Sequence, residues 1–207
     1  MTLTDAYVHI SESRRMPAEV THLLRADAQD NRDRALDAAK SLFAERGIAA
    51  VTMRDIARRA GIGPATLYRR FATKQVLVDQ AFAEEAAECA RVVREGTADR
   101  DAWRGFRAAI TELCGLGVRN QGFTDAFTAD HGDPASLAAH RAGLLRALAG
   151  LARRAQQQGR LRADFTIDDV VLILRAGRGL STVPLADRAA AARRFAALAI
   201  DALAAAR

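Results

Sequence analysis

The chain has 207 residues, of which 50% are hydrophobic, with a formal net charge of +6 and two cysteines. Its length allows one domain or two modest ones with a sizeable core, and its richness in alanine, leucine and arginine favours an all-α fold over one with strands. The two cysteines indicate neither a disulfide framework nor a zinc site, and no apolar run approaches the roughly 20 residues that span a bilayer, so we expect a soluble, cytoplasmic protein.

The N-terminal stretch, residues 1 to 29, shows no sustained helical period, and we expect a mobile extension there. Its Arg14 and Arg15 could contact DNA as a basic arm, although a disordered leader is the favoured interpretation. The first helix is predicted from Asn31 to Arg46, where apolar residues recur at steps of three and four.

Two short helices and a glycine turn are predicted between Thr52 and Lys74. Thr52 and Asp55 have the spacing of a capping box, in which the hydroxyl and the carboxylate each accept from a free backbone amide at the helix start. Gly61 can adopt a positive φ and ends this helix, and Pro64 suits the first position of the next. Such a pair is typical of a helix-turn-helix, whose second helix enters the major groove of DNA.

The sequence from Arg34 to Lys74 adds specific motifs to this pattern. The segments ALDAAKSLFAERG, DIARRAGIG and TLYRRFATK closely resemble the N-terminal domain of TetR-family transcriptional repressors. The resemblance implies that Arg54 and the opening of the second short helix face base edges, while hydroxyl groups and a lysine contact phosphates. The residues expected to contact DNA are Thr52, Arg54, Gly63, Pro64, Ala65, Thr66, Tyr68, Arg69, Arg70 and Lys74.

The charge distribution agrees with a DNA-binding segment. Residues 31 to 79 carry a net charge of +5, against −2 for residues 1 to 30 and +3 for residues 80 to 207. A local basic excess of this kind is the electrostatic footprint of nucleic-acid binding. For Tyr68 the alternative is a half-buried core position. Several arginines have a solvated charged face as their alternative: Arg58, Arg59, Arg69 and Arg70.

The rest of the chain is predicted as a second set of helices. A long helix from Lys74 to about Glu95 joins the two parts, so a ligand that shifted this helix would move the DNA-reading head. In a dimer the two heads must stay about 34 Å apart to fit both half-sites. Capping residues and apolar periods predict further helices that begin after Asp99 or Asp101, at Gly122, after Asp133, after Thr166 and at Leu185.

The last two helices are predicted to join two subunits. The run from Val170 to Leu174 has almost no polar residue, so its helix should be buried on more than one side, which indicates a partner subunit in a chain of this size. The final helix, from about Leu185 to Ala206, is predicted to offer Phe195, Leu198, Ala199, Ala202 and Leu203 for close packing. The segment GRLRADFTIDD and these two helices also resemble the effector domain of many TetR-family proteins, where they form a four-helix bundle in a homodimer.

A small-molecule pocket is expected among the middle helices, because ligand sites are mostly apolar with a few polar groups. Each lining residue has plain core packing as its alternative. The candidates are Trp103, Phe106, Ile110, Phe123, Phe127, His140, Leu144 and Arg175. His131 and His140 are too far apart to share a helical face, so we expect neither a metal nor a cofactor. Cys114 is expected to be inert packing rather than an oxidant sensor.

Together these features predict an all-α protein with a mobile extension (1–29), a helix-turn-helix DNA-binding domain (30–79) and a helical ligand-binding and dimerisation domain (80–207). No catalytic spacing of residues is found, so we expect no enzyme. The expected function is a sequence-specific regulator, most simply a repressor, that binds a palindromic operator as a homodimer and is released by a small-molecule effector. The alternative is a helical architectural or interaction module that binds DNA nonspecifically.

Overall fold

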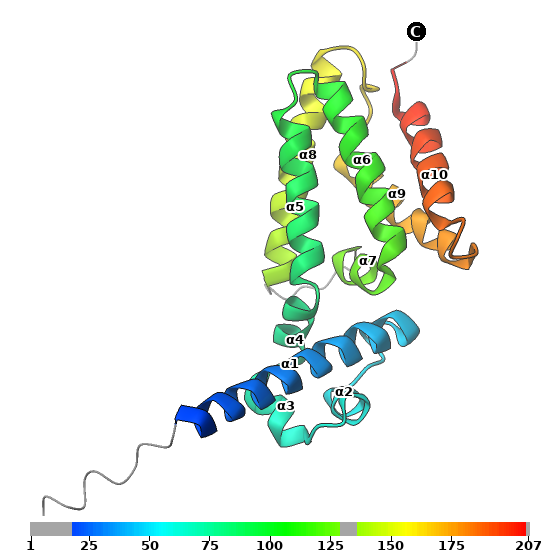
Figure 1. The fold of residues 1–207 in the computed structure, drawn as a ribbon. Helices are drawn as coiled ribbons and strands as arrows, with labels where there is room; N and C mark the ends of the chain where they lie inside the picture. Colours follow the sequence, from blue (N-terminus) through cyan, green and yellow to red (C-terminus); the bar gives the residue numbers. More distant parts are fainter. Residues whose placement is uncertain (1–17, 129–135, 206–207) are drawn as a thin grey trace, which may run out of the picture.

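The computed structural model describes residues 18–128 and 136–205. Within these ranges the chain forms ten α-helices, one short 3-10 helix and no strand, which confirms the all-α prediction (Figure 1). The elements are α1 Ala18–Arg46, α2 Met53–Ala60, α3 Pro64–Arg70, α4 Lys74–Ala81, α5 Ala83–Ala98, α6 Ala102–Arg119, α7 Gln121–Thr128, α8 Ser136–Gln157, α9 Ile167–Ala176, η1 Gly177–Thr182 and α10 Arg188–Leu203.

The helices divide into a small head, α1 to α4, and a larger body, α5 to α10. Figure 1 shows α5, α6 and α8 running along the long axis of the body, with α7 at the end nearest the head. Helix α6 is central, because it packs against α5, α8 and α10. In the head, α1 crosses below the body and covers α2 and α3. This arrangement leaves α2 and α3 at the far end of the molecule.

The local signals predicted for the head are confirmed. The Thr52 hydroxyl accepts from the Asp55 amide at 3.2 Å, and the Asp55 carboxylate accepts from the Thr52 amide at 3.0 Å. Gly61 has a φ of 64° at the end of α2, and Pro64 stands in the first turn of α3. The apolar side chains of both helices, with Phe71 just after the second, are buried: Met53, Ile56, Ala57, Ala60, Leu67 and Phe71.

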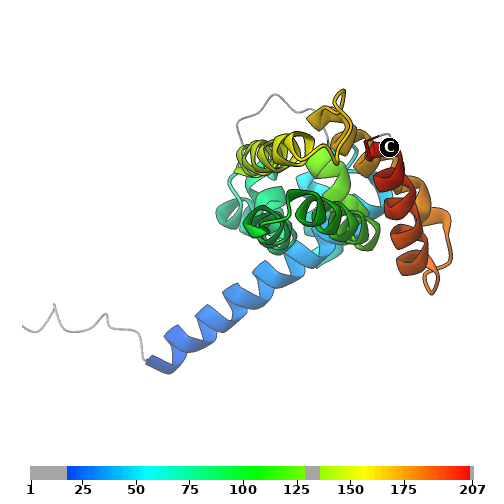
Figure 2. The same ribbon diagram turned by 90° about the horizontal axis from the view of Figure 1, so that it is seen from above.

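Helix α1 is longer than predicted, since it begins at Ala18 and not near Asn31. Residues 18–29 are rich in alanine, leucine and other good helix formers, which accounts for a helix without an apolar period. Figure 2 shows this N-terminal half projecting away from the body. Arg14 and Arg15 lie outside the described residues, and the division into three parts stays a prediction.

The predicted long helix from Lys74 is wrong, because it is interrupted at Phe82. This residue has φ −110° and ψ 15° and separates α4 from α5. Its fully buried ring lies 6.0 Å from the ring of Phe43 on α1 and 5.8 Å from that of Phe123 on α7. Packing between the head and the body therefore places the break, and no proline or glycine in the sequence signals it.

The C-terminal helices α9 and α10 begin close to where the sequence predicts them. The Asp169 carboxylate accepts from the Thr166 amide at 2.8 Å and starts α9 as predicted. The predicted cap at Asp133 lies outside the described residues. Helix α10 begins at Arg188 after η1, and its Leu198 is 52% exposed. The side chains that α10 buries are Ala192, Ala196, Ile200 and Leu203.

The head is joined to the body by a polar contact beside the aromatic one. The Glu85 Oε1 atom on α5 accepts from Lys40 Nζ on α1 at 3.2 Å and from Asn120 Nδ2, just before α7, at 2.7 Å. The other carboxylate oxygen, Oε2, is buried without a hydrogen-bond partner among the described atoms. A carboxylate in this position depends on its lysine for compensation of its charge.

Replacing Lys40 should therefore destabilise the protein more than the loss of one contact would suggest. We expect Lys40→Met to lower the free energy of unfolding by about 1–3 kcal/mol, because it leaves a part-buried carboxylate poorly paired. Adding Glu85→Gln should recover part of this loss, with a coupling of about 1 kcal/mol in a double-mutant cycle measured by urea unfolding. Strictly additive effects would contradict the contact.

The close crossing of α5 and α6 requires glycine at Gly105. A Cβ atom there would lie 2.2 Å from the carbonyl oxygen of Gly96 on α5, and backbone cannot yield as a flexible side chain would. We expect Gly105→Ala to lower the free energy of unfolding by about 1–3 kcal/mol through overpacking. Gly143→Ala, in α8 with open space around its Cβ position, is the matched control and should stabilise by about 0.5–1 kcal/mol. Urea unfolding monitored by circular dichroism compares the two.

Candidate nucleic-acid interface and ligand pocket

The outer face of α3 is exposed and built from small residues at its start. Gly63, Pro64 and Ala65 are all exposed, so another molecule can approach the backbone closely there. Tyr68, one turn later, is 50% exposed, which places its ring on the surface and not in the core. Leu67 is fully buried and fixes the helix to the head. The face that the sequence assigns to DNA is thus free of contacts with the body.

The arginines of α2 differ in how they are engaged. Arg58 donates to the Asp55 carboxylate at 2.7 Å, and Arg59 donates with both terminal nitrogens to the Glu45 carboxylate at 2.9 Å each. Arg54 is exposed and has no hydrogen-bond or ion-pair partner among the described residues. Of these three guanidinium groups, Arg54 is the one available to an external ligand.

Thr52 and Lys74 also support the structure of the head. The Thr52 hydroxyl is engaged in the capping box and donates to the Asp55 carboxylate at 2.6 Å. The Lys74 amine donates to the backbone carbonyl of Ile48, in the turn between α1 and α2. Burial lowers the pKa of Lys74 from its usual value. Since an ammonium group has three donors, this bond leaves Lys74 able to meet a phosphate as well.

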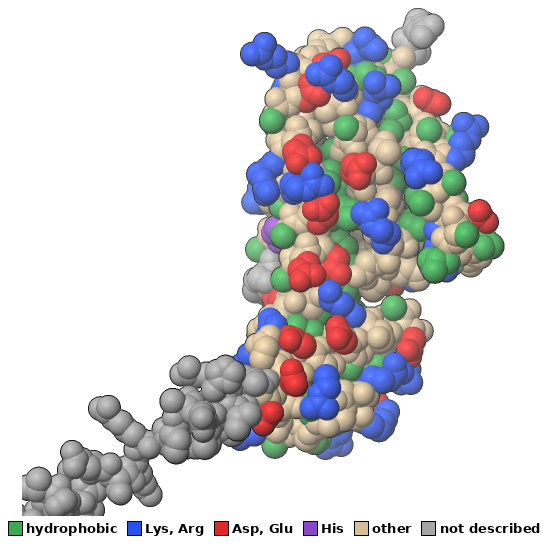
Figure 3. All heavy atoms as spheres, viewed as in Figure 1, with side chains coloured by type: hydrophobic (Ala, Val, Ile, Leu, Met, Phe, Trp, Pro, Cys, Tyr) green, Lys and Arg blue, Asp and Glu red, His purple; other side chains and the backbone are tan. Residues whose placement is uncertain are grey.

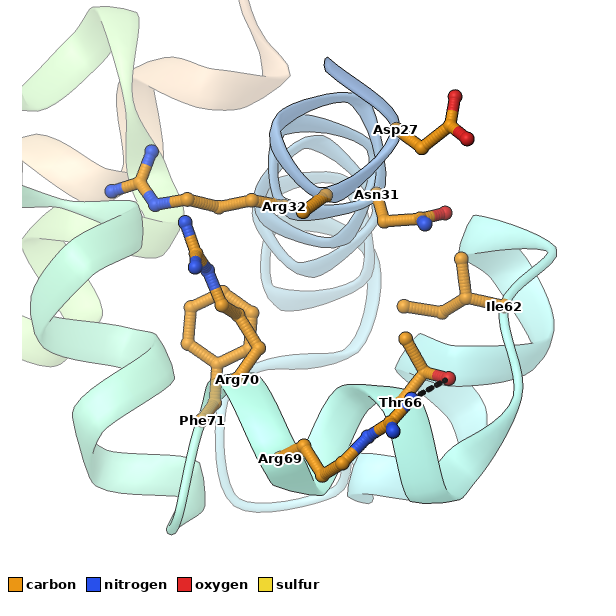
Figure 4. A pocket seen from close by; sticks show the side chains of 9 residues that line it. Asp27, Asn31, Arg32, Ile62, Thr66, Arg69, Arg70 and Phe71 are labelled. Atoms are coloured by element: carbon orange, nitrogen blue, oxygen red, sulfur yellow. Dashed lines mark hydrogen bonds between the residues drawn. The ribbon is translucent and has the colours of Figure 1, made fainter. Parts of the chain in front are cut away.

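A basic hollow of about 370 Å³ lies between α3 and the exposed part of α1 (Figure 4). Arg32, Arg69 and Arg70 line it together with Phe71 and Thr66, and Arg69 donates to the Thr66 hydroxyl at 3.2 Å. Figure 3 shows lysine and arginine side chains gathered at the lower end of the head. A phosphate backbone beside α3 would meet these positive groups. Arg32 joins them only through tertiary packing, because it lies far from α3 in the sequence.

The residues predicted to form a ligand pocket lie in separate places. Trp103 and Phe106 stack at the start of α6, where the Phe106 ring meets that of Phe165 at 5.5 Å. Phe123 and Phe127 pair on α7, at the other end of α6. The apolar candidates are packed core side chains that are 8% exposed or less: Trp103, Phe106, Ile110, Phe123, Phe127 and Leu144.

The two polar candidates are also apart from each other. The Nε2 atom of His140 on α8 lies 2.8 Å from the backbone oxygen of Ala86 on α5. The Arg175 guanidinium, at the surface of α9, donates to the backbone carbonyl of Thr128 at the end of α7. Arg175 therefore faces the junction with the head and not the aromatic core. The two roles stay predictions.

Both cysteines are buried thiols. Burial, with a smaller contribution from Glu88 and Glu85, raises the pKa of Cys89 to about 12, and burial raises the pKa of Cys114 to about 11. A thiol with such a pKa has a negligible thiolate fraction near neutral pH and is a poor nucleophile. None of the helices within 18–128 and 136–205 has the length and apolar character needed to cross a membrane.

Two family models match the chain. Residues 35–81 match the bacterial regulatory proteins of the tetR family. Residues 100–205, about half of the chain, match the C-terminal domain of SbtR-like transcriptional regulators. The first match covers the helix-turn-helix with its supporting helix, and the second covers α6 to α10 of the body.

Individual relatives agree with these matches. The HTH-type transcriptional repressor KstR2 of Rhodococcus jostii is 51% identical over 49 residues, which is 24% of this chain and 24% of that protein. The HTH-type transcriptional regulator UidR of Escherichia coli is 27% identical over 112 residues, 47% of this chain and 57% of that protein. The chain thus spans between about a quarter and 57% of the length of these curated relatives. The crystal structure of the TetR regulator SCO0520 from Streptomyces coelicolor is 28% identical, with a TM-score of 0.52 over 85% of this chain and 99% of that one.

The cap of α2 makes the stability of the head depend on pH. Hydrogen bonds from the Thr52 hydroxyl and amide, and then the charge of Arg58, lower the pKa of Asp55. A depressed folded-state pKa stabilises the fold above the unfolded value of about 4, and the contribution is lost as pH falls through the folded value. We expect Asp55→Asn to unfold at lower urea than the wild type at pH 7, with the difference shrinking as the pH falls below about 4. A difference that stays constant over this range would contradict the capping role.

Proposed function

Because the chain belongs to the tetR family of bacterial regulatory proteins, we propose that it is a sequence-specific DNA-binding transcriptional regulator that represses the genes beside its operator. Two exposed side chains of the head carry this proposal: Arg54 on α2, which has no partner among the described residues, and the half-exposed Tyr68 on α3. Repression, rather than activation, is supported by the name of the relative KstR2. Such a regulator acts in the cytoplasm, where the chromosome is.

In this proposal α3 enters the major groove by its N-terminal end. Gly63, Pro64 and Ala65 let the backbone approach the groove floor, and the Arg54 guanidinium forks onto a guanine. Thr66 and Tyr68 contact phosphates, and Arg69, Arg70 and Lys74 extend this contact along the strand. Small residues at the start of α3 carry little hydrogen-bonding information, so much of the specificity rests on Arg54 and on the spacing of two half-sites.

The proposal places two subunits together through α9 and α10. Leu172 on α9 is 65% exposed and Leu198 on α10 is 52% exposed. Exposed leucines on the two terminal helices fit a face that a second copy of the chain covers. In such a homodimer the two heads must lie about 34 Å apart to reach successive major grooves of a palindromic operator.

A small-molecule effector would release the protein by opening the packed core of the body. Rings on α7 touch Phe82, which in turn touches Phe43 on α1, so a ligand that separates them moves the head. A coupling of about 1–3 kcal/mol, roughly 5- to 150-fold in operator affinity, is sufficient. A ligand that enters near Phe123 and Phe127 acts on the head directly through Phe82. A ligand near Trp103, at the far end of α6, would not contact this ring.

Selection of genomic DNA fragments by the purified protein, at a salt concentration near physiological, tests the function. An enriched palindromic site supports a dimeric, specific regulator, and the genes beside it narrow the chemistry of the effector. Uniform recovery of all fragments would instead support nonspecific binding through phosphates. The comparison must be made at fixed salt, because phosphate contacts alone weaken as salt rises.

Replacing the two exposed residues of the reading face should remove specific binding without unfolding the protein. We expect Arg54→Ala to weaken binding to the selected site by at least about tenfold, in line with about 1–3 kcal/mol for a good base contact. Tyr68→Ala should also weaken binding, because it removes a phosphate contact that positions α3. Arg153→Ala, an exposed arginine on α8, is the charge-matched control and should bind as the wild type does. Fluorescence anisotropy measures binding, and circular dichroism checks the fold. Wild-type affinity in both head variants would overturn the proposed interface.

A further inference from the structure

A second hollow, of about 420 Å³, lies where the head meets the body. One wall is the turn between α1 and α2, residues 47–49, and the other is formed by Asp125 and Thr128 of α7. Arg175 of α9 and Arg178 of η1 complete it. The hollow is therefore lined by three segments that are far apart in the sequence: residues 47–49, 125–128 and 175–178. It is separate from the packed aromatic core that the proposed function assigns to an effector.

Among the described residues, the charges that line this junction hollow are not balanced. It is lined by two guanidinium groups and one carboxylate. Arg175 donates to a backbone carbonyl, that of Thr128, and has no ion pair among the described residues. Its positive charge is thus met by a neutral acceptor. A hollow with one excess guanidinium attracts an anion.

The single carboxylate in the hollow is poorly satisfied. Arg178 Nε lies 2.9 Å from Asp125 Oδ1, yet the same oxygen is buried without a hydrogen bond of acceptable alignment. Burial raises the pKa of Asp125, and the charge of Arg178 offsets this only in part. The Arg178 side chain is 56% exposed, so it can leave this partner for another at little cost in packing. An external carboxylate could offer the fork geometry that Asp125 lacks.

We infer that the junction hollow is a binding site for a small organic carboxylate, held by Arg175 and Arg178 in competition with Asp125. The guanidinium groups match a planar carboxylate in two-point contact. The side chains of Ile48 and Ala49 offer an apolar surface to the rest of the ligand. The two arginines bind the acid group and the apolar wall binds the rest of the ligand, so the site prefers an organic acid to an inorganic anion.

The position of the site connects an occupant to the reading head. The Ile48 carbonyl in its wall accepts from the Lys74 amine at the start of α4, and the same turn leads into the cap of α2. A bound acid touches the head through this turn and the body through the two arginines. Occupancy of the site therefore favours one placement of the head relative to the body.

Isothermal titration of the full chain, without DNA, with acetate, butyrate, benzoate and inorganic phosphate tests the site. We expect butyrate or benzoate to bind more tightly than acetate or phosphate. The Arg175→Ala, Arg178→Ala double variant should weaken this binding at least about tenfold, as expected for loss of charged hydrogen bonds. Asp125→Asn, which removes the internal competitor, should strengthen it by about tenfold.

The matched control is Arg153→Ala, which removes an exposed arginine from α8 and should leave carboxylate binding unchanged. Equal binding by the wild type and the double arginine variant would overturn the site, as would the absence of binding in Asp125→Asn. Phosphate binding as tight as that of the organic acids would overturn the assigned ligand class. The titration needs no operator, so its result is independent of DNA binding. Failure of the carboxylate site and failure of the proposed function can therefore be told apart.

Discussion

The ring of Phe82 is the point on which the arrangement of head and body depends. It lies between Phe43 of α1 and Phe123 of α7, and aromatic pairs of this kind contribute about 0.5–1.5 kcal/mol each beyond the area they bury. Gly122 permits this packing, because a Cβ there would lie 3.3 Å from both the Ala44 amide nitrogen and the Phe82 ring. The helix break at Phe82 follows from the need to place its ring between two helices that belong to different parts of the molecule.

Around this contact, polar groups tie the head to the body at two places. Lys40 and Asn120 share one oxygen of Glu85, close to the aromatic contact. Further along α1, the turn after Arg46 meets Arg178 and Asp125, whose pairing is less complete. The first joint holds the head by hydrogen bonds from Lys40 and Asn120 to Glu85. The second joint has two arginines and one aspartate among the described residues, so it carries an excess positive charge. Motion of the head is therefore easier to bias at the second joint than at the first.

Within the head, internal pairing decides which positive charges can act on DNA. Arg59 pairs with Glu45 and so joins α2 to α1, whereas Arg58 pairs with Asp55 within α2. Arg54, on the same short helix, has no hydrogen-bond or ion-pair partner within residues 18–128 and 136–205. The sequence alone does not distinguish these three arginines. Their geometry shows that Arg58 and Arg59 form ion pairs within the head, whereas Arg54 is left for contact with DNA. Arg32 belongs to α1 and is far from α3 in the sequence. Folding brings it to the hollow beside α3, where its charge adds to those of the α3 arginines.

The sequence by itself determined the features that depend on neighbouring residues. These are the all-α fold, the capping boxes at Thr52 and Thr166, the glycine turn at Gly61 and the exposed start of α3, since each follows from contacts within about four positions. Only the tertiary structure decided the break at Phe82, the separation of the eight predicted pocket residues and the place of Arg175 beside the head. These features arise from contacts between helices far apart in the chain, and helical periodicity shows that a side chain is buried without showing which helix covers it.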